Sequence, residues 1–558
     1  MKRFFYFLLL TIVLVGFGLS CSNNEVPDKP IPGIEPPPPP DPPTGDPTIE
    51  GDVEINFDVL TVTVKNPYEN EGITITPDKA HVVVRSTVSD TVTYVIAGAT
   101  PNGSLKIYSE TPFILMMNGI GITNLNDPAL NIQTKKKATI TLVDGSTNYF
   151  VGGKEFISDG GDEKAKAAFF SRGQLVFTGT GGLAIYSYNR HAICSDDYIR
   201  VNGGHITIPY SENDGLHAKD YIEINDGTID IKSLGDGMDS EGHLILNGGA
   251  ITINTYGDKA HGIKSATETT VQSSGTIDIH VQRDAAKGFK SGGDMFISQG
   301  DISIKASGEA CYDEEEKDIS SASGIKCNGN LVIDGGQMVI LSSGLGGKGI
   351  NVNGALTIND GHLEITSTGD AYKNAAYNTK AKALKIDGDL TVNGGLIYAE
   401  SHSDHAISAK GNLTIDGGAV IGVGKSASKK GLDGSSQFRI TGGTLVGVGG
   451  AISSPTVNAC TQYVVNYSGK LTQNTLFHVA SSVGMKILTY QMPYPFSKGY
   501  LLFSSPVLVQ NTNYTISSGG AVTNGSSFGG LYNDATYTGG TAIATFRTSP
   551  SSMVININ

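Results

Sequence analysis

The chain contains a repeat that reads DGLHAKDYIEINDGTIDIKSLG at residues 214–235 and DGMDSEGHLILNGGAITINTYGDKA at residues 236–260. Each copy has glycine in the second position, an apolar residue in the third, and two isoleucines spaced two residues apart near its end. A period of two is typical of short strands with one buried face, and the glycine is typical of a sharp turn. Each copy therefore predicts three short strands within about 22 residues.

Ten consecutive copies of this unit cover the middle of the chain. They begin at His191, Asp214, Asp236, His261, Lys287, Ser323, Lys348, Lys382, His405 and Lys430. The second position is glycine or alanine and the third is apolar in every copy. Because such a unit buries its apolar face only by stacking on its neighbours, the repeat predicts an all-β protein, a right-handed parallel β-helix. With weaker units upstream, we expect about 13 coils of three strands each.

The twelfth position of the unit is rich in asparagine and aspartate. The residues of this type are Asn202, Asn225, Asn247, Asp334, Asn359, Asn393 and Asp416. Side-chain amides at one turn of successive coils can hydrogen-bond along the stack. We therefore expect a polar ladder at this turn.

Length and composition exclude some classes of protein. The 558 residues exceed what one globular core usually organises, which agrees with a repeat array. The chain is 17% charged and 39% hydrophobic, which excludes a wholly disordered protein. A formal net charge of −14 argues against nucleic acid as a partner, because phosphate binding needs a basic face.

The N-terminus has the pattern of a bacterial lipoprotein. A basic start and a short apolar run end at Ser20-Cys21, which predicts a signal peptide over residues 1–21 with Cys21 as the lipidated residue, although Gly18 replaces the usual aliphatic residue. An ordinary secretory signal is the alternative. Residues 22–47 are rich in proline, which is typical of a stiff stalk. We expect export and attachment to the outer membrane or cell surface through the lipid alone.

The remaining chain divides into two parts. Residues 48–455 carry the coils, and residues 456–558 lack them but contain alternating strands, which predicts a small antiparallel β cap over the open end of the helix. Two insertions, at about 307–322 and 367–381, are expected to project from one side. Cys311 and Cys327 flank the first insertion, and the sequence leaves open whether they form a disulfide or two separate thiols.

Stretches on both sides of the coils carry a resemblance to a known family. They are NGIGITNLNDPALNIQTKKKATITLVDGSTNYF (118–150), EKAKAAFFSRGQLVFTGTGGLAIYS (163–187) and KGYLLFSSPVLVQNTNYTISSGG (498–520). The run from about Asp58 to Gly520 resembles the carbohydrate-binding β-helix family first described in a cellulolytic clostridium. The resemblance implies a polysaccharide ligand, either cellulose or an acidic sugar polymer, and bound calcium.

Lysine recurs in two columns of the unit. If the third position points inward, the fourth points outward and the first lies at the adjoining turn. Eight of the twenty residues in these columns are lysine: Lys264, Lys287, Lys290, Lys326, Lys348, Lys382, Lys385 and Lys430. Coils stack at ~4.8 Å, so these side chains form a stripe that matches the carboxylates of a uronate chain. The alternative is that the lysines only keep an exposed sheet soluble.

In the coils that precede the lysine stripe, the first and fourth positions of the unit include acidic residues. Asp214 and Asp236 occupy equivalent positions on successive coils, with Asn213 and Asp239 close by. Calcium takes six to eight oxygen ligands, so these four residues are a candidate calcium site, with ordinary Asp-Gly turn chemistry as the alternative. The histidines in these columns lack the spacing of a transition-metal motif.

The leading hypothesis is a non-catalytic, surface-displayed protein that binds acidic polysaccharide such as polygalacturonate, and also cellulose. Its ligand-binding residues are Lys264, Lys287, Lys290, Lys326, Lys348, Lys382, Lys385, and Tyr372 and Tyr377 in the second insertion. One alternative is a calcium-dependent pectate-type lyase with Lys264 as the base that abstracts the C5 proton. A second alternative is an adhesin or spacer without a sugar site.

Overall fold

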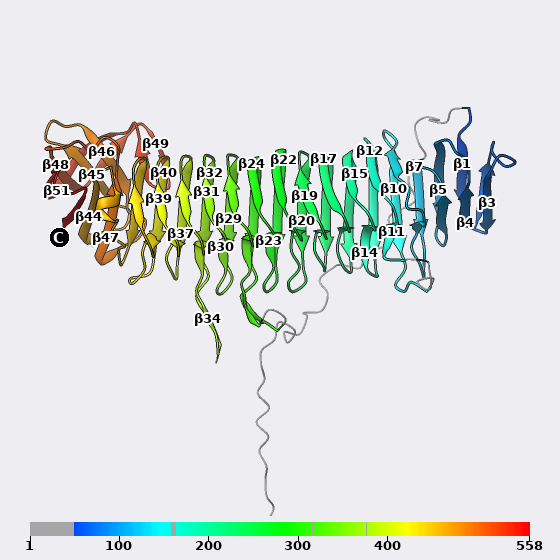
Figure 1. Ribbon diagram of the computed structural model, residues 1–558, viewed down its shortest axis with the longest axis horizontal. Coiled ribbons are helices and arrows are strands. Elements are labelled where there is room, and N and C mark those ends of the chain that lie inside the picture. The colour runs from blue at the N-terminus through cyan, green and yellow to red at the C-terminus, as the bar shows by residue number, and fades with distance from the viewer. Residues whose placement is uncertain (1–49, 158–162, 164, 315–316, 375) are drawn as a thin grey trace, which may run out of the picture.

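The protein is a long rod of stacked coils (Figure 1). The computed structural model describes residues 50–157, 163, 165–314, 317–374 and 376–558. The predicted signal peptide, the stalk and Cys21 lie outside the described residues. None of the described segments forms a helix long and apolar enough to cross a membrane.

One face of the rod is a 15-stranded sheet. Its strands are β3 (Ile73–Asp78), β4 (His81–Ser86), β6 (Ser104–Ser109), β8 (Leu130–Ile132), β11 (Ala167–Ser171), β14 (His191–Ser195), β16 (Leu216–Ala218), β18 (Met238–Ser240), β21 (Ile263–Ser265), β23 (Lys287–Ser291), β27 (Ser323–Cys327), β30 (Lys348–Val352), β35 (Lys382–Ile386), β38 (Ile407–Ala409) and β41 (Leu432–Gly434). Only β3 is antiparallel to its neighbour, so 14 strands from β4 to β41 pair in parallel, one for each coil. We call this sheet the first face.

The rest of the rod is a 27-stranded sheet. Its strands are β1 (Val53–Asp58), β2 (Thr61–Lys65), β5 (Val92–Thr100), β7 (Phe113–Thr123), β9 (Ala138–Leu142), β10 (Thr147–Gly152), β12 (Leu175–Gly179), β13 (Gly182–Ser187), β15 (Ile199–Ser211), β17 (Tyr221–Ser233), β19 (His243–Leu246), β20 (Ala250–Thr255), β22 (Thr269–Val281), β24 (Met295–Ala306), β28 (Leu331–Ile333), β29 (Gln337–Ser342), β31 (Leu356–Ile358), β32 (His362–Ser367), β36 (Leu390–Val392), β37 (Leu396–Ser401), β39 (Leu413–Ile415), β40 (Ala419–Gly424), β42 (Phe438–Ile440), β43 (Thr444–Gly449), β44 (Val464–Leu471), β47 (Phe496–Ser504) and β52 (Val554–Ile557). Long strands such as β17 pair with two strands of the next coil, β19 and β20, so each coil crosses two further faces. The predicted three-stranded coil is confirmed.

The apolar third positions form the core of the rod. From Ile193 to Leu432 they pair in register along the first face, and each is buried. They belong to one hydrophobic cluster that runs from Val53 at one end of the rod to Leu502 in the cap. Each coil thus completes its core with side chains of the coils above and below it.

The glycines in the second position allow this close stacking. A Cβ atom built on Gly215, Gly237, Gly262, Gly288, Gly324 or Gly349 would lie 2.3–2.5 Å from an isoleucine Cγ2 and 2.5–2.8 Å from a carbonyl oxygen of the next coil. Side-chain atoms do not approach other atoms so closely without displacing them. The glycines are therefore needed for the spacing between coils.

The predicted polar ladder at the twelfth position is present. The Asn225 amide donates to Asn202 Oδ1 at 2.8 Å, and the Asn247 amide donates to Asn225 Oδ1 at 2.7 Å. A second run continues from Asp334 through Asn359 to Asn393, with bonds of 2.6 and 2.7 Å. These bonds satisfy side-chain polar groups along one corner of the rod.

The C-terminal part closes the helix, as predicted. β47 pairs antiparallel with β43 of the last coil, so the open sheet edge is covered. A six-stranded sheet packs beside it, and its strands are β45 (Leu476–Ser481), β46 (Lys486–Gln491), β48 (Asn513–Thr523), β49 (Ser526–Phe528), β50 (Leu531–Asn533) and β51 (Thr536–Arg547). A short 3-10 turn, η1 (Val457–Ala459), precedes β44.

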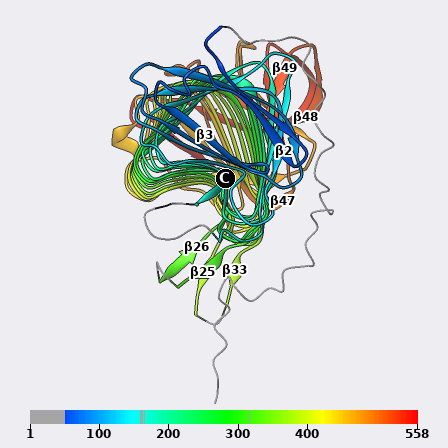
Figure 2. The same ribbon diagram turned by 90° about the vertical axis from the view of Figure 1, so that its right-hand side faces the viewer.

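The two insertions form hairpins that project from the same side of the rod (Figure 2). The first hairpin consists of β25 (Cys311–Asp313) and β26 (Asp318–Ser320), and the second of β33 (Tyr372–Lys373) and β34 (Asn378–Thr379). Cys327 carries a free, buried thiol, so the bridge to Cys311 that the sequence left open does not form.

Candidate functional site

The fourth positions of the coils lie side by side on the outside of the first face. Strand pairing places Lys264 opposite Lys290, and Lys290 opposite Lys326. The row continues through Asn351 to Lys385. Because neighbouring strands are ~4.8 Å apart, this part of the lysine stripe is a regular track along the rod.

Two of the four first-position lysines do not share this exposure. Lys287 is 6% exposed and Lys348 is 3% exposed, so the expectation that they belong to a solvent-facing stripe is wrong. Lys287 Nζ donates to Ala285 O at 2.5 Å and to Ser320 Oγ at 2.7 Å, so the first hairpin covers it. The insertions are not part of the repeating unit, and they fold back over the turn that carries the first position. The repeat alone therefore could not predict this burial.

Lys348 ties the two insertions together. Its Nζ donates to Gly346 O and Lys380 O, both at 2.6 Å, and contacts Ser321 Oγ at 3.4 Å and Thr379 Oγ1 at 3.1 Å. Burial lowers the pKa of Lys348 to about 7, and the charges of nearby lysines act in the same direction. Its role in the structure is to anchor the loops beside the site.

We expect Lys348→Met to change how stability depends on pH. The folded protein releases this proton near pH 7 and the unfolded chain near pH 10.5, so the contribution to stability is complete above pH 10.5 and is lost as the pH falls to about 7. In urea unfolding followed by circular dichroism, the wild type should gain about 2 kcal/mol relative to Lys348→Met between pH 7 and pH 9, since groups such as His217 titrate alike in both proteins. The variant should lack this gain, and an equal gain in both proteins would contradict the assignment.

Acidic groups compensate several of the other lysines. Lys264 Nζ lies 3.1 Å from both Asp236 Oδ2 and Asp239 Oδ2. Further ion pairs join Lys382 to Asp404 at 3.5 Å, Lys385 to Asp387 at 2.8 Å and Lys430 to Asp433 at 2.6 Å. Lys290 forms no ion pair with any described residue. Among the described residues, the positive charge of Lys290 is therefore not offset by a paired carboxylate.

A surface hollow of about 320 Å³ surrounds these lysines. Its lining includes Lys287, Lys290, Lys326, Lys385, Asn328, Asn351, Asn353, Asp318 and Asp387. Residues Asp318 to Ser321 of the first insertion form one wall, and the first face forms the floor. We call it the lysine hollow: its lining contains four lysines, of which Lys287 has its amine bonded under the first hairpin, three asparagines and two aspartates.

The predicted tyrosines lie in the second hairpin, outside the lining of the lysine hollow. The Tyr377 ring stacks on Tyr312 of the first hairpin, with ring centroids 4.6 Å apart and an angle of 21°. Tyr372 pairs with Thr379 within its own hairpin. The stack therefore joins the two insertions, which together stand beside the hollow.

The four candidate calcium ligands separate into two groups. Asp236 and Asp239 converge on Lys264, whose ammonium occupies the point between their oxygens. Asp214 instead faces two histidines, and its Oδ1 accepts the Asp236 backbone N–H at 2.8 Å. A calcium ion needs six to eight oxygens around one point. As arranged, the side chains of Asp236 and Asp239 face Lys264 and that of Asp214 faces the histidines, and calcium binding by these residues and Asn213 stays a prediction.

Lys264 does not have the protonation that a base requires. Burial disfavours its charged form, but Asp236 and Asp239 outweigh this effect and raise the pKa of Lys264 above its usual value. A lysine that abstracts a proton must first lose its own. The geometry therefore does not supply the base of the lyase hypothesis.

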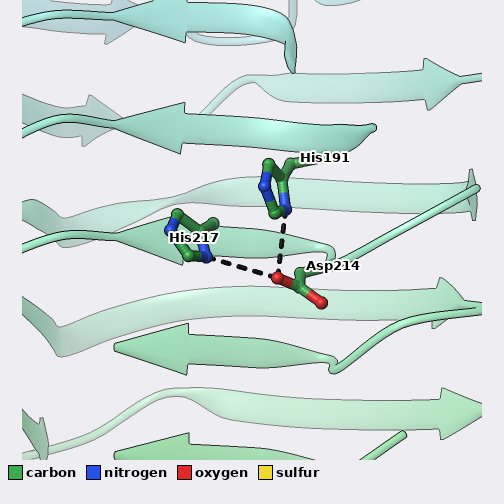
Figure 3. Close-up of side chains that lie close together, drawn as sticks. All are labelled: His191, Asp214 and His217. Carbon is green, nitrogen blue, oxygen red and sulfur yellow. Dashed lines mark hydrogen bonds and ion pairs between the residues drawn. The ribbon is translucent and has the colours of Figure 1, made fainter. Parts of the chain in front are cut away.

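His191, Asp214 and His217 form a cluster that the sequence motifs did not reveal (Figure 3). Nδ1 of His191 lies 3.0 Å from Asp214 Oδ2, and Nδ1 of His217 lies 3.2 Å from the same oxygen. Burial acts against both charges, but the contacts with Asp214 and Asp239 raise the pKa of His217 to about 9, and those with both histidines lower the pKa of Asp214. One feature of the sequence could have predicted this cluster: its three residues occupy first or fourth positions of the unit in adjacent coils.

Comparison with known proteins shows the family of this chain. A family model described as "Carbohydrate-binding domain-containing protein" matches residues 84–371 and 320–466, which together exceed half of the chain. The chain belongs to this family. This match confirms the expected carbohydrate-binding family.

Two similar proteins match smaller parts of the chain. A carbohydrate-binding domain-containing protein of Acetivibrio thermocellus is 26% identical over 118 residues, which make up 21% of this chain and 41% of that protein. The chain thus matches less than half of that relative's length. A solved structure of the polysaccharide lyase-like protein from C. thermocellum, a gadolinium derivative, has 24% identity and a TM-score of 0.39, and the match covers 45% of this chain and 96% of that one.

Proposed function

We propose that this protein is a non-catalytic carbohydrate-binding lipoprotein, displayed on the cell surface, whose ligand is an acidic polysaccharide such as polygalacturonate. The observation that carries the proposal is the lysine hollow. It gathers four lysines on a chain whose formal net charge is −14. A local basic surface on an acidic protein attracts a polyanion to that place.

The spacing of the row supports a polymeric ligand. A uronate chain has one carboxylate per sugar, and successive coils present side chains every ~4.8 Å. One exposed ion pair contributes only ~0–1 kcal/mol, so useful affinity requires several amines to act on one chain. Amides of Asn328, Asn351 and Asn353 in the same hollow offer hydrogen bonds to sugar hydroxyls.

The proposal predicts that binding depends on the carboxylates of the polymer. In gel-retardation assays, polygalacturonate should retard the protein, and a fully methyl-esterified polymer should retard it at least about tenfold less strongly, because the ester removes the charge. Raising the salt from 0.15 to 1 M should release the polymer, because the screening length falls from ~8 to ~3 Å. Equal retention by both polymers would contradict the proposal.

The same assay addresses the finer expectations. Cellulose as a second ligand is tested by pull-down with insoluble cellulose. The calcium prediction is tested by chelation, and retention that is unchanged in a chelator would contradict it. Incubation with polygalacturonate and calcium should give no ultraviolet-absorbing unsaturated products, since Lys264 stays protonated; their formation would overturn the non-catalytic assignment.

A further inference from the structure

Three side chains of adjacent coils present metal-binding atoms to one point, away from the lysine hollow. His191 begins β14, Asp214 precedes β16, and His217 is the middle residue of β16. One donor atom from each lies within 4.8 Å of the other two. The parallel pairing of Ile193 with Leu216 sets this arrangement, because it aligns equivalent positions of the two coils.

The histidine pair is nearly buried, and both rings face Asp214. The side chains of His191 and His217 are each 15% exposed, and that of Asp214 is 8% exposed. The imidazole rings stack with centroids 4.3 Å apart and an angle of 22°, and both turn Nδ1 toward Asp214 Oδ2 (Figure 3). Nearly buried polar rings that face one carboxylate are costly unless each makes a good bond.

The contact between His191 and Asp214 is not a well-aligned hydrogen bond. His191 Nδ1 is buried and lies 3.0 Å from Asp214 Oδ2, yet it is not aligned to form a hydrogen bond with any described residue. The carboxylate cannot turn to improve the contact, because its Oδ1 is held by the backbone N–H of Asp236. A buried nitrogen that has an ion-pair contact but no aligned hydrogen bond, and that faces a shared oxygen, is what a bound cation would satisfy.

We propose that His191 Nδ1, Asp214 Oδ2 and His217 Nδ1 bind one divalent transition-metal ion, with Zn²⁺ as the representative. Two imidazole nitrogens and one carboxylate, with a further position open, are a ligand set that zinc accepts, at about 2.0–2.2 Å from each atom. Calcium prefers oxygen ligands throughout, so this set selects against it. Because the rings are close to parallel, binding requires both to rotate about χ2 until their lone pairs converge.

An open hollow gives an ion access to this cluster. A hollow of about 460 Å³ is lined by all three residues together with Glu212, Asp236 and Asp239. Asp239 Oδ2 lies 3.5 Å from His217 Nδ1, so it is placed to reach the position that the three ligands leave open. The carboxylates that line this hollow favour a divalent cation over an anionic sugar. The three proposed ligands are not part of the polysaccharide-binding row, although Lys264, the first lysine of that row, also lines this hollow.

Metal titration of the full chain, prepared without a histidine tag, tests the proposal. Isothermal titration with Zn²⁺ should give one ion per chain, Ca²⁺ in excess should not displace it, and Co²⁺ should produce visible absorption bands. His191→Gln and His217→Gln should each weaken Zn²⁺ binding at least about tenfold. His280→Gln, a change of a half-exposed histidine that contacts Ser307, is the matched control and should bind like the wild type.

Two outcomes would overturn the proposal: failure of the wild type to bind Zn²⁺, or equal binding by the wild type and both glutamine variants. Thermal unfolding followed by circular dichroism separates loss of the site from loss of the fold. If a glutamine variant unfolds early, Asp214→Asn serves in its place, since its side-chain oxygen can still accept the Asp236 N–H while the charge is removed. Unchanged Zn²⁺ binding by a folded Asp214→Asn variant would also count against the site.

Discussion

Replacing Lys290, Lys326 and Lys385 together by glutamate is expected to weaken binding to polygalacturonate by about 100-fold. These residues occupy the fourth positions of their coils, and all three line the lysine hollow. Each attraction of ~0–1 kcal/mol becomes a repulsion of similar size, so three reversals amount to about 3 kcal/mol. Since every 1.4 kcal/mol corresponds to a factor of ten, the loss is about two orders of magnitude. Gel retardation at 0.15 M salt measures it.

The control for this variant reverses the same amount of charge elsewhere. Lys135, Lys136 and Lys137 are exposed in a turn that belongs to a coil nearer the N-terminus. Their triple glutamate variant lowers the net charge of the protein by the same six units but leaves the hollow intact. If binding depends on the local row, this control should lose little affinity. A similar loss in both variants would show that overall charge, and not the row, governs binding.

The repeat allowed most of the fold to be predicted, because burial in a β-helix follows the period of the unit. The third positions are buried from Ile193 to Leu432, and the fourth positions from Lys264 to Lys385 form one row, as expected. The first positions were placed wrongly for Lys287 and Lys348. Their burial depends on how the hairpins fold back over the turn, and the irregular sequences of the insertions carry no period from which this can be predicted.

The histidine cluster could not be predicted from motif spacing for a related reason. Transition-metal motifs place their ligands a few residues apart on one element, whereas His191 and His217 come from different coils. They lie close together because successive coils stack on one another in the folded protein. In the acidic columns, the position in the repeating unit did not predict which residue each carboxylate contacts. Asp214 contacts the histidines and Asp236 contacts Lys264, because each carboxylate pairs with the basic side chain nearest to it.

Gly288→Val is expected to destabilise the protein by about 3 kcal/mol, because the helix has no room for a side chain at this position. A Cβ atom on Gly288 would lie 2.4 Å from Ile304 Cγ2 and 2.6 Å from Gly324 O of the next coil. The backbone oxygen cannot move without separating two coils, and the isoleucine is fixed in the core. Urea unfolding followed by circular dichroism measures the loss. Because Gly288 lies on the same strand as Lys290, the variant should also lose polysaccharide binding.

Gly182→Val is the matched control for this change. The same substitution at the start of β13 places the new Cβ 3.7 Å from Ser146 O, which is an ordinary contact, so stability should change little. Gly288→Ala should fall between the two variants, since Ala192, Ala383 and Ala406 show that a methyl group is accepted at the second position of other coils. If Gly288→Val were as stable as Gly182→Val, the coils would be free to separate at this level. The regular spacing that lines up Lys290 with Lys326 would then not be enforced by the glycines, and the row would lose its structural basis as a track for a polyanion.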